Sequence, residues 1–417
     1  MILKFFGAAR EVGRSAILLK DVCSIMLDYG IKLNHKIEYP TNMPNIDALV
    51  LSHAHLDHSG DVPALYNEML IPSFGTEPTL ELSELLLKDS LNIAKKEHAK
   101  QRFHKRQIAS FARRYTSIGY NSRCSIGDFD IEFHDAGHIC GSAITLVERR
   151  KALHNKRIVY TGDFKLMPQY LHRGADVVKS DVLIIESTYA TLDHPDREQL
   201  EYELAEKIKE TLDNNGTALL PVFAVGRAQE LLIFLHKHGL TQYTYVDGMA
   251  RTATSIAMRH HDFIDNYESL ARAVDDSTAI KDRESRGQAL NSPAIILTTA
   301  GMLSGGPVLD YITRLRKNSH IFLTGYQVEG SNGRTLMDSA TITINKKPVR
   351  IDAAVSYYDM SAHAGKKELY EYVKRSSPTT VVCVHGDSRN TVALAENLKE
   401  EGYNAYAPKL DDTIRLD

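Results

Sequence analysis

Cysteine is scarce in this chain and never forms a CxxC pair. The four cysteines are Cys23, Cys124, Cys140 and Cys383. Their wide spacing argues against a disulfide scaffold and against a thiolate zinc site, and it favours a reducing, cytoplasmic compartment. No apolar run reaches the length of a transmembrane helix, and the N-terminus lacks the pattern of a signal peptide. We therefore expect no membrane partner.

The sequence also lacks Pro/Ser-rich linkers, low-complexity segments and internal repeats. Its 417 residues nevertheless exceed one ordinary core, so we expect two domains. The hydrophobic content of 43% and the charged content of 25% are typical of a globular protein. The formal net charge of -3 neither demands nor forbids a nucleic-acid partner, which would need a local basic surface.

The first part of the chain is rich in short strand-like stretches, with helical periodicity over residues 79–115. A turn is predicted near His154 and Asn155. After about residue 195, strands alternate with helices, which predicts a parallel sheet. The first of these helices is expected to end at Gly216, a C-cap position. The C-terminal segment again resembles the strand-rich first part of the chain, so we predict a first domain that is interrupted by an inserted one.

Candidate metal ligands follow the ends of the predicted strands. His53, His55, Asp57 and His58 come directly after an apolar run. The others each follow a later strand: His138, Asp163, Glu186 and His385. If these strands lie side by side, the side chains converge on one edge of a sheet, where active sites of layered α/β folds commonly lie.

Without Glu186, seven candidate ligands remain, which is more than the four that one tetrahedral shell holds. We therefore predict two metal ions, and His and carboxylate ligands together suit zinc. Asp163 is the carboxylate that can bridge. The predicted shells are His53, His55 and His138 with Asp163, and Asp57, His58 and His385 with Asp163. Two cations about 3.5–4 Å apart can activate a shared hydroxide and clamp a phosphate for in-line attack.

A plainer interpretation is that these histidines are structural or lie at the surface, since the chain has 18 of them. A single metal without catalysis is another alternative. The H-x-H-x-D-H spacing is dense, however, and the later His, Asp and His follow strands in a suitable order. A catalytic metal centre is therefore the favoured interpretation.

Several motifs resemble one known family. HAHLDH at 53–58 is similar to the signature of the metallo-β-lactamase fold. Glu186 in IIESTY, His363 in MSAHAG and His385 in VCVHGD resemble further motifs of its β-CASP nuclease branch. Further agreement spans nearly the whole chain, in GAAREVGRS, PVFAVGRAQELL, TTAGMLSGGP and TGYQVEGSNGRTL. The branch includes the endonuclease subunit of the cleavage and polyadenylation specificity factor, its archaeal relatives and, more distantly, RNase J.

The resemblance implies an α/β fold, in which a metallo-β-lactamase αββα sandwich carries an inserted β-CASP α/β domain of mainly parallel sheet. The first domain would comprise residues 1–191 and 351–417, and the insertion residues 192–350. The active site would lie in the cleft between the domains, with two Zn2+ per chain in the shells given above. Some relatives carry N-terminal KH domains or a long C-terminal extension, and partners bound through those parts are not implied here.

The resemblance also implies roles for individual residues. Asp28 in IMLDYG matches an aspartate that orients the histidine loop from behind the ligands; alone, it reads equally as a turn aspartate. Glu186 and His363 match a pair beside the metals, and with Asp57 they are the predicted catalytic residues. His363 could protonate the leaving 3′-oxygen while Glu186 holds its tautomer. The alternative is a buried histidine in a turn.

His385 bears on the substrate, because family members that act on RNA carry histidine at this motif and DNA-repair members carry valine. Residues 95–114 carry eight Lys/Arg against one acidic residue, which fits either phosphate binding or a solvated helix face. Further predicted RNA contacts are a helix start and Gly-rich loops, which also occur as plain turns: Arg227, Ser304, Gly305, Gly306 and Arg334.

These features predict a zinc-dependent ribonuclease for single-stranded RNA, an endonuclease, a 5′→3′ exonuclease or both, in RNA processing or decay. The alternatives are an inactive RNA-binding scaffold of an RNA-processing complex and a small-molecule metallohydrolase. The complete ligand set opposes the first, and the insertion with Glu186, His363 and His385 opposes the second. A homodimer and partners in a processing complex are both compatible with the sequence.

Overall fold

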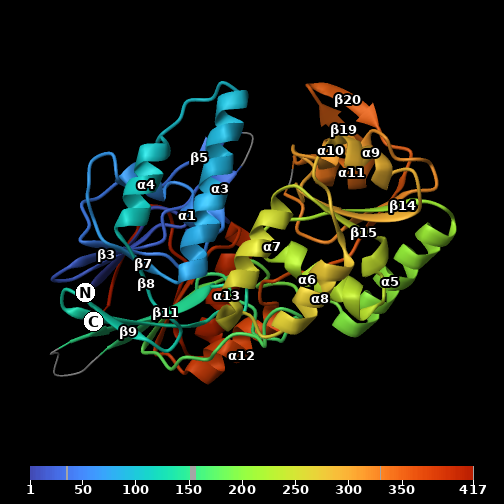
Figure 1. Cartoon of the computed structure of the whole chain (residues 1–417). Coiled ribbons are helices and arrows are strands. Elements are labelled where there is room, and N and C mark those ends of the chain that lie inside the picture. Colours follow the sequence, from blue (N-terminus) through green and yellow to red (C-terminus); the bar gives the residue numbers. More distant parts are fainter. Residues whose placement is uncertain (34–35, 151–155, 329, 417) are drawn as a thin grey trace. The chain divides into compact units, whose positions relative to one another are not determined.

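The computed structural model describes residues 1–33, 36–150, 156–328 and 330–416, and the chain divides into two compact units (Figure 1). Unit 1 comprises residues 1–168, 173–193 and 363–417, and unit 2 comprises residues 169–172 and 194–362. The turn predicted at His154 and Asn155 lies outside the described residues.

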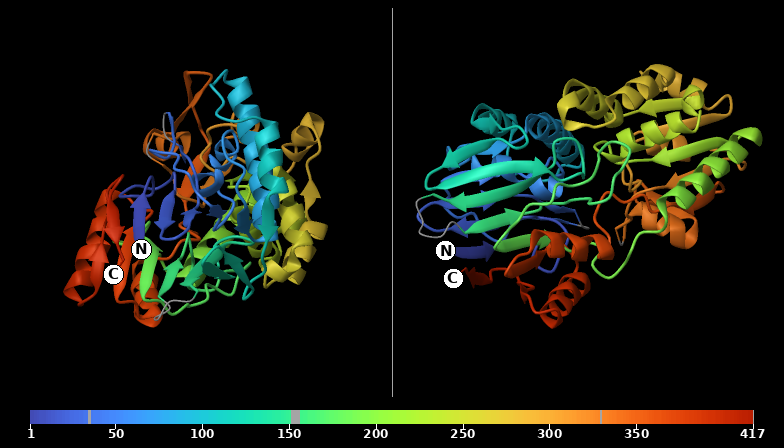
Figure 2. Two further views of the ribbon diagram at one scale, coloured as in Figure 1. Left: turned by 90° about the vertical axis from the view of Figure 1, so that its left-hand side faces the viewer. Right: turned by 90° about the horizontal axis from the view of Figure 1, so that it is seen from below.

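The first sheet of unit 1 has the strand order β24-β1-β2-β3-β6-β7-β8. Its strands are β1 (Ile2–Phe5), β2 (Ile17–Lys20), β3 (Ser24–Leu27), β6 (Ala48–Val50), β7 (Ser73–Gly75), β8 (Tyr115–Ser117) and β24 (Thr413–Arg415). A small hairpin pairs β4 (Lys32–Leu33) with β5 (Ile37–Glu38). Because β1 pairs antiparallel with both β2 and β24, the first and last strands of the chain lie side by side (Figure 2).

The second sheet of unit 1 has the order β23-β22-β13-β12-β11-β10-β9. Its strands are β9 (Arg123–Ile126), β10 (Phe129–Asp135), β11 (Ala143–Arg149), β12 (Arg157–Tyr160), β13 (Val182–Glu186), β22 (Thr380–Val384) and β23 (Asn404–Tyr406). From β12 to β23 the neighbours run parallel, so the carboxyl ends of β12, β13 and β22 meet at one edge. That edge positions the site described below.

The core of unit 1 lies between these two sheets. Successive side chains of a strand point to opposite faces, so β13 places Ile184 in this core and Leu183 and Ile185 on the outer face. That outer face packs against α12 (Lys366–Ser376) and α13 (Ser388–Glu400). The first sheet packs its outer face against α2 (Val62–Leu65) and α4 (Lys105–Arg113). These four layers confirm the predicted αββα sandwich.

Unit 2 is built on a six-stranded sheet with the order β16-β15-β17-β14-β18-β21, in which every pair is parallel. This confirms the predicted parallel sheet. The strands are β14 (Thr217–Pro221), β15 (Thr244–Asp247), β16 (Thr278–Ala279), β17 (Ala294–Thr298), β18 (His320–Leu323) and β21 (Ala354–Tyr357), with a separate hairpin of β19 (Thr341–Ile344) and β20 (Lys347–Arg350).

The helices of unit 2 are α5 (Arg197–Asp213), α6 (Arg227–Lys237), α7 (Met249–Arg259), α8 (Tyr267–Asp276), α9 (Arg283–Ala289), α10 (Val308–Ile312) and α11 (Asn332–Ser339). Unit 1 also holds α1 (Leu56–Ser59) and the long α3 (Glu77–Lys96). Among the described helices, none combines the length and the apolar character needed to cross a membrane.

Two details differ from the sequence-based expectations. Residues 351–362, expected in the first domain, lie in unit 2, because β21 pairs with β18 at the edge of its sheet. Gly216 is not the left-handed residue after α5; Asn215 is, with φ 55°. Gly216 is instead in close contact with a neighbouring backbone, since a Cβ there would lie 2.1 Å from the Asn318 carbonyl oxygen.

Candidate metal centre

Strand ends and one histidine loop of unit 1 bring the predicted ligands together. The loop after β6 carries His53 and His55 and runs into α1, which holds Asp57 and His58. The other ligands follow the second sheet: His138 comes after β10, Asp163 after β12, and His385 directly after β22. His385 is in the left-handed region, with φ 48°, which is uncommon for a residue other than glycine.

The first ligand set consists of His53, His55, His138 and Asp163, whose ligand atoms all lie within 4.8 Å of one another. Nε2 of His138 is 3.1 Å from Nδ1 of His55. Oδ2 of Asp163 is 3.6 Å from Nε2 of His53 and 3.9 Å from Nε2 of His138.

The second set consists of Asp57, His58, Asp163 and His385. Nε2 of His58 is 3.3 Å from Nε2 of His385 and 3.3 Å from Oδ1 of Asp163. Oδ2 of Asp57 is 3.3 Å from Nε2 of His385. The two carboxylate oxygens of Asp163 therefore face different ligand sets.

These residues fit zinc. In a tetrahedral shell with bonds of about 2.1 Å, ligand atoms lie about 3.4 Å apart, close to the separations found here. Nε2 of His53 and Oδ1 of Asp163 are buried without a hydrogen-bond partner among the described residues. Burial, and next the neighbouring His58, hold the pKa of His53 well below its usual value, so its ring is the neutral form that binds metals.

Asp28 lies behind the ligands and holds His58. Its Oδ2 accepts from Nδ1 of His58 at 2.6 Å, which leaves Nε2 facing the second ligand set. The hydroxyls of Ser52 and Tyr160 each donate to Oδ2 of Asp28 at 2.7 Å, and the Ser52 amide donates to its Oδ1. Ser52 and Tyr160 escaped the sequence analysis, because neither belongs to a motif that signals this contact.

Glu186 and His363 form a pair beside the ligand sets. Nδ1 of His363 is 3.1 Å from Oε2 of Glu186 and 3.9 Å from Oδ2 of Asp163. Glu186 is fully buried, and its Oε1 also accepts from the Phe164 amide. Burial alone would lower the pKa of His363, but the carboxylates of Glu186 and Asp163 outweigh it and raise the pKa to about 9.

A buried ion pair that the sequence did not reveal holds the backbone of His363. Nζ of Lys165 donates to the His363 carbonyl at 3.1 Å and to Oε1 of Glu368 at 2.6 Å. Glu368 in turn accepts from the amides of Leu166, Met167 and Gly365. This network ties the His363 loop to the loop that carries Asp163. Lys165 and Glu368 are about 200 residues apart, so sequence spacing gives no sign of the pair.

If the site cleaves RNA as the sequence predicts, Lys165→Met should lower kcat about 10- to 100-fold with little change in KM, because His363 loses the group that fixes its position. Zinc content should stay at the wild-type level, and Lys165→Arg should restore part of the rate. The measurement is kcat and KM for Lys165→Met, made once in the wild-type protein and once in the His363→Ala protein. A loss of the same size in the His363→Ala background would mean that Lys165 does not act through His363.

The predicted RNA contacts lie in unit 2, in segments that follow the carboxyl ends of parallel strands. Arg227 is the buried first residue of α6, after β14. Ser304, Gly305 and Gly306 follow β17, and a Cβ on Gly305 would meet nothing within 4 Å. Arg334, in α11 after β18, is paired with Asp338 at 3.0 Å, so part of its charge is neutralised. The parallel order places these segments at one edge of the sheet.

Comparison with known proteins agrees with this arrangement. Residues 30–221 match a beta-lactamase superfamily domain, residues 228–336 a Beta-Casp domain, and residues 348–408 a Zn-dependent metallo-hydrolase RNA specificity domain. The chain is 39% identical to a probable RNase MJ4 of Methanocaldococcus jannaschii, over 100% of both chains. It is 33% identical to RNase aCSPSF2 of Saccharolobus solfataricus, over 99% of this chain and 85% of that one.

A transcription termination factor FttA of Methanocaldococcus jannaschii is 32% identical, over 99% of this chain and 71% of that one. A crystal structure of a protein of unknown function from Enterococcus faecalis V583 shares the fold, with a TM-score of 0.65 at 15% identity, over 100% of this chain and 99% of that one. The chain therefore belongs to the β-CASP branch of the metallo-β-lactamase superfamily, a family of metal-dependent hydrolases that includes ribonucleases.

Proposed function

We propose that the protein is a zinc-dependent ribonuclease that hydrolyses phosphodiester bonds of single-stranded RNA and leaves 5′-phosphate and 3′-hydroxyl ends. The observation that carries this proposal is the Glu186–His363 pair beside two ligand sets that share Asp163. Relatives named as ribonucleases support RNA as the substrate. One relative is named a transcription termination factor, so cleavage near the end of a transcript is a fitting role.

Each set holds four of the chain's side chains, and the proposed occupancy is one zinc ion in each. When bound, two zinc ions supply an activated water and positive charge for the phosphate oxygens. His53, His55 and His138 would hold one ion, and Asp57, His58 and His385 would hold the other, with Asp163 contributing an oxygen to each set. Asp28 orients His58 through Nδ1, so that Nε2 is free for the metal.

The proposed proton donor is His363. Nδ1 of His363 donates a hydrogen bond to Glu186, and the raised pKa keeps the ring protonated, so Nε2 also carries a proton. That Nε2 proton would pass to the leaving 3′-oxygen. Glu186 fixes the tautomer and stabilises the protonated ring. Lys165 holds the backbone of His363, so the ring is placed before the substrate binds.

The proposal is tested with RNAs that carry a 5′-triphosphate, a 5′-monophosphate or a 5′-hydroxyl, each labelled at one end. We expect zinc-loaded protein to cut them into products with 5′-phosphate and 3′-hydroxyl ends, and a chelator to abolish cutting. Internal products would indicate endonuclease activity, and mononucleotides that depend on a 5′-monophosphate would indicate a 5′→3′ exonuclease. Zinc-loaded protein that binds these RNAs without cutting them would instead be the inactive scaffold.

A further inference from the structure

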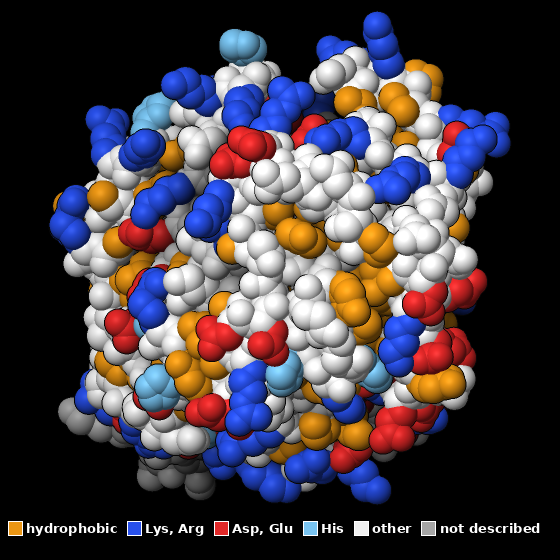
Figure 3. All heavy atoms as spheres, turned by 45° about the vertical axis from the view of Figure 1, so that its right-hand side comes forward, with side chains coloured by type: hydrophobic (Ala, Val, Ile, Leu, Met, Phe, Trp, Pro, Cys, Tyr) orange, Lys and Arg blue, Asp and Glu red, His pale blue; other side chains and the backbone are white. Residues whose placement is uncertain are grey.

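Helices α3 and α4 carry a cluster of exposed cations. Both helices bury an apolar stripe, with Leu87 and Leu91 on α3 packed against Ile108 on α4 and Phe103 between them. Because these stripes face inward, the basic side chains face solvent. The α3–α4 basic surface is defined by five exposed residues: Lys95, Lys96, Lys100, Lys105 and Arg106. Lys and Arg side chains gather over this end of the helices in Figure 3.

None of these five cations forms an ion pair within the part of the chain that the structure describes. Their neighbours differ. Lys88 is paired with Glu84 at 2.5 Å, and Arg102 is paired with the buried Asp61 at 2.9 Å and lies over the Tyr39 ring. A merely solvated helix face commonly carries compensating charges one turn away. Asp89 interacts electrostatically with Lys96 without forming an ion pair, so most of the positive charge of this surface is uncompensated, although the chain as a whole is slightly acidic.

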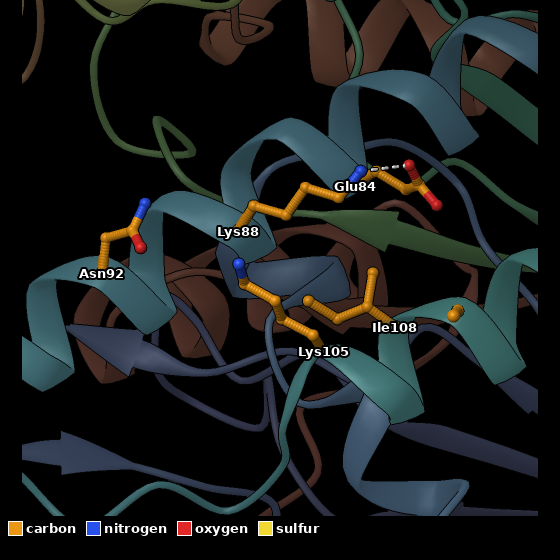
Figure 4. Close-up of a pocket in the computed structure, with 6 residues that line it drawn as sticks. Glu84, Lys88, Asn92, Lys105 and Ile108 are labelled. Atoms are coloured by element: carbon orange, nitrogen blue, oxygen red, sulfur yellow. Dashed lines mark hydrogen bonds and ion pairs between the residues drawn. The ribbon is translucent and has the colours of Figure 1, made fainter.

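A groove of about 250 Å³ runs between the two helices beside this surface (Figure 4). It is lined by Glu84, Lys88, Asn92, Lys105, Ile108 and Ala109. Figure 4 shows Lys88 and Asn92 on α3 and Lys105 and Ile108 on α4 bordering one hollow. Lys88 is already paired with Glu84 here, so the free cation of the groove is Lys105, beside the Asn92 amide and an apolar floor that includes Ile108. These groups suit a ligand that alternates flat, partly apolar groups with anions, which is the chemistry of a single strand of nucleic acid.

We propose that the α3–α4 basic surface binds the sugar-phosphate backbone of the RNA substrate, outside the bond that is cut. This inference rests on the proposed function for the identity of the substrate. A lipid surface fits less well, because Ile93 is the only large hydrophobic residue of segment 88–114 that is markedly exposed. Lysine ammonium groups contact phosphates and not base edges. The affinity for RNA at this surface should therefore be independent of base sequence and should fall steeply as the salt concentration rises.

The test compares two variants of equal charge in the slowly cutting His363→Ala protein. The first replaces Lys95, Lys96, Lys100 and Lys105 with glutamine. The matched control replaces four cations that form ion pairs elsewhere, of which the two arginines are exposed and the two lysines half-exposed: Lys207, Lys209, Arg314 and Arg375. Affinity for a labelled 30-nucleotide uridine RNA is measured by fluorescence anisotropy from 50 to 400 mM NaCl.

Each phosphate contact contributes about 0.7 to the slope of log K against log salt for single strands, so the first variant should lose about 2.8 units of slope. Between 50 and 200 mM NaCl, its affinity should then fall about 50-fold less than that of the parent protein. The control should lose less than about 0.7 units. Equal slopes for the two variants would overturn the proposal, as would an acidic peptide that binds more tightly than RNA through the same lysines.

The outcome is separable from that of the proposed function. If the zinc-loaded wild-type protein cuts RNA but the two variants bind RNA alike, the basic surface alone is refuted. If the slope falls as expected but no RNA is cut, the surface binds RNA and the ribonuclease proposal fails.

Discussion

Asp163→Asn should lose both bound zinc ions and reduce kcat/KM for RNA by about 10³-fold or more, an effect of about 4 kcal/mol on the transition state. The reason lies in the two carboxylate oxygens, which face different ligand sets at 3.3 Å from His58 and 3.6 Å from His53. An amide nitrogen cannot replace the second oxygen as a ligand, and the remaining amide oxygen is neutral and binds zinc more weakly than a carboxylate oxygen. Both ligand sets are therefore weakened. Zinc content by mass spectrometry, together with cleavage of end-labelled RNA, measures both effects.

Two comparison variants sharpen this result. Asp57→Ala leaves the first ligand set complete, so it should retain about one zinc ion while losing most of the activity. Asp130→Asn serves as the matched control, because Asp130 lies in β10 and pairs with Arg150 away from the ligands. Asp163→Asn protein with two zinc ions and a near-normal rate would refute the bridging role.

His363→Ala should slow cleavage by about 10²- to 10⁴-fold while both zinc ions stay bound, because the protein loses the proposed proton donor and none of the proposed ligands of the two sets. In the proposed mechanism the protonated form of His363 is the active acid, so the wild-type rate should fall as pH rises through its pKa. The carboxylates raise that pKa to about 9, and bound cations lower it from there. His363→Ala should lack this alkaline decline.

The measurement is a single-turnover rate from pH 6 to 10, with zinc content recorded at each end of the range. His134→Ala is the matched control, since His134 contacts Asn121 and Glu132 and none of the ligands. Loss of zinc in His363→Ala protein would make His363 a ligand. An unchanged alkaline decline in that variant would assign the decline to another group.

Much of the metal centre could be predicted because its residues recur at fixed points of a repeated pattern. A His or Asp follows the end of several buried strands: His138 follows β10, Asp163 follows β12 and His385 follows β22. The end of each of these strands therefore predicts one candidate ligand. The four histidine-loop residues are dense enough to be noticed alone. Parallel pairing of β12, β13 and β22 then brings Asp163, Glu186 and His385 to one edge, as the strand pattern implied.

The supporting contacts were not predictable, because they join segments far apart in the sequence through common residue types. Lys165 and Ser52 stand beside recognised ligands, yet a lysine or serine there is equally compatible with many environments. From sequence, residues 351–362 are assigned to the first domain. They contain β21, and nothing in its sequence indicates which sheet it joins. Its pairing with β18 is decided by tertiary packing and not by local propensity.

The order of the ligands along the chain has a consequence for biosynthesis. A ribosome that has made residues 1–350 has produced His53, His55, His138 and Asp163, but neither His363 nor His385. The last strand that pairs with β1 is also missing at that stage. A polypeptide that ends at residue 350 therefore lacks the proposed proton donor and one proposed ligand of the second set, so the proposed activity is expected only after the C-terminal segment has been made.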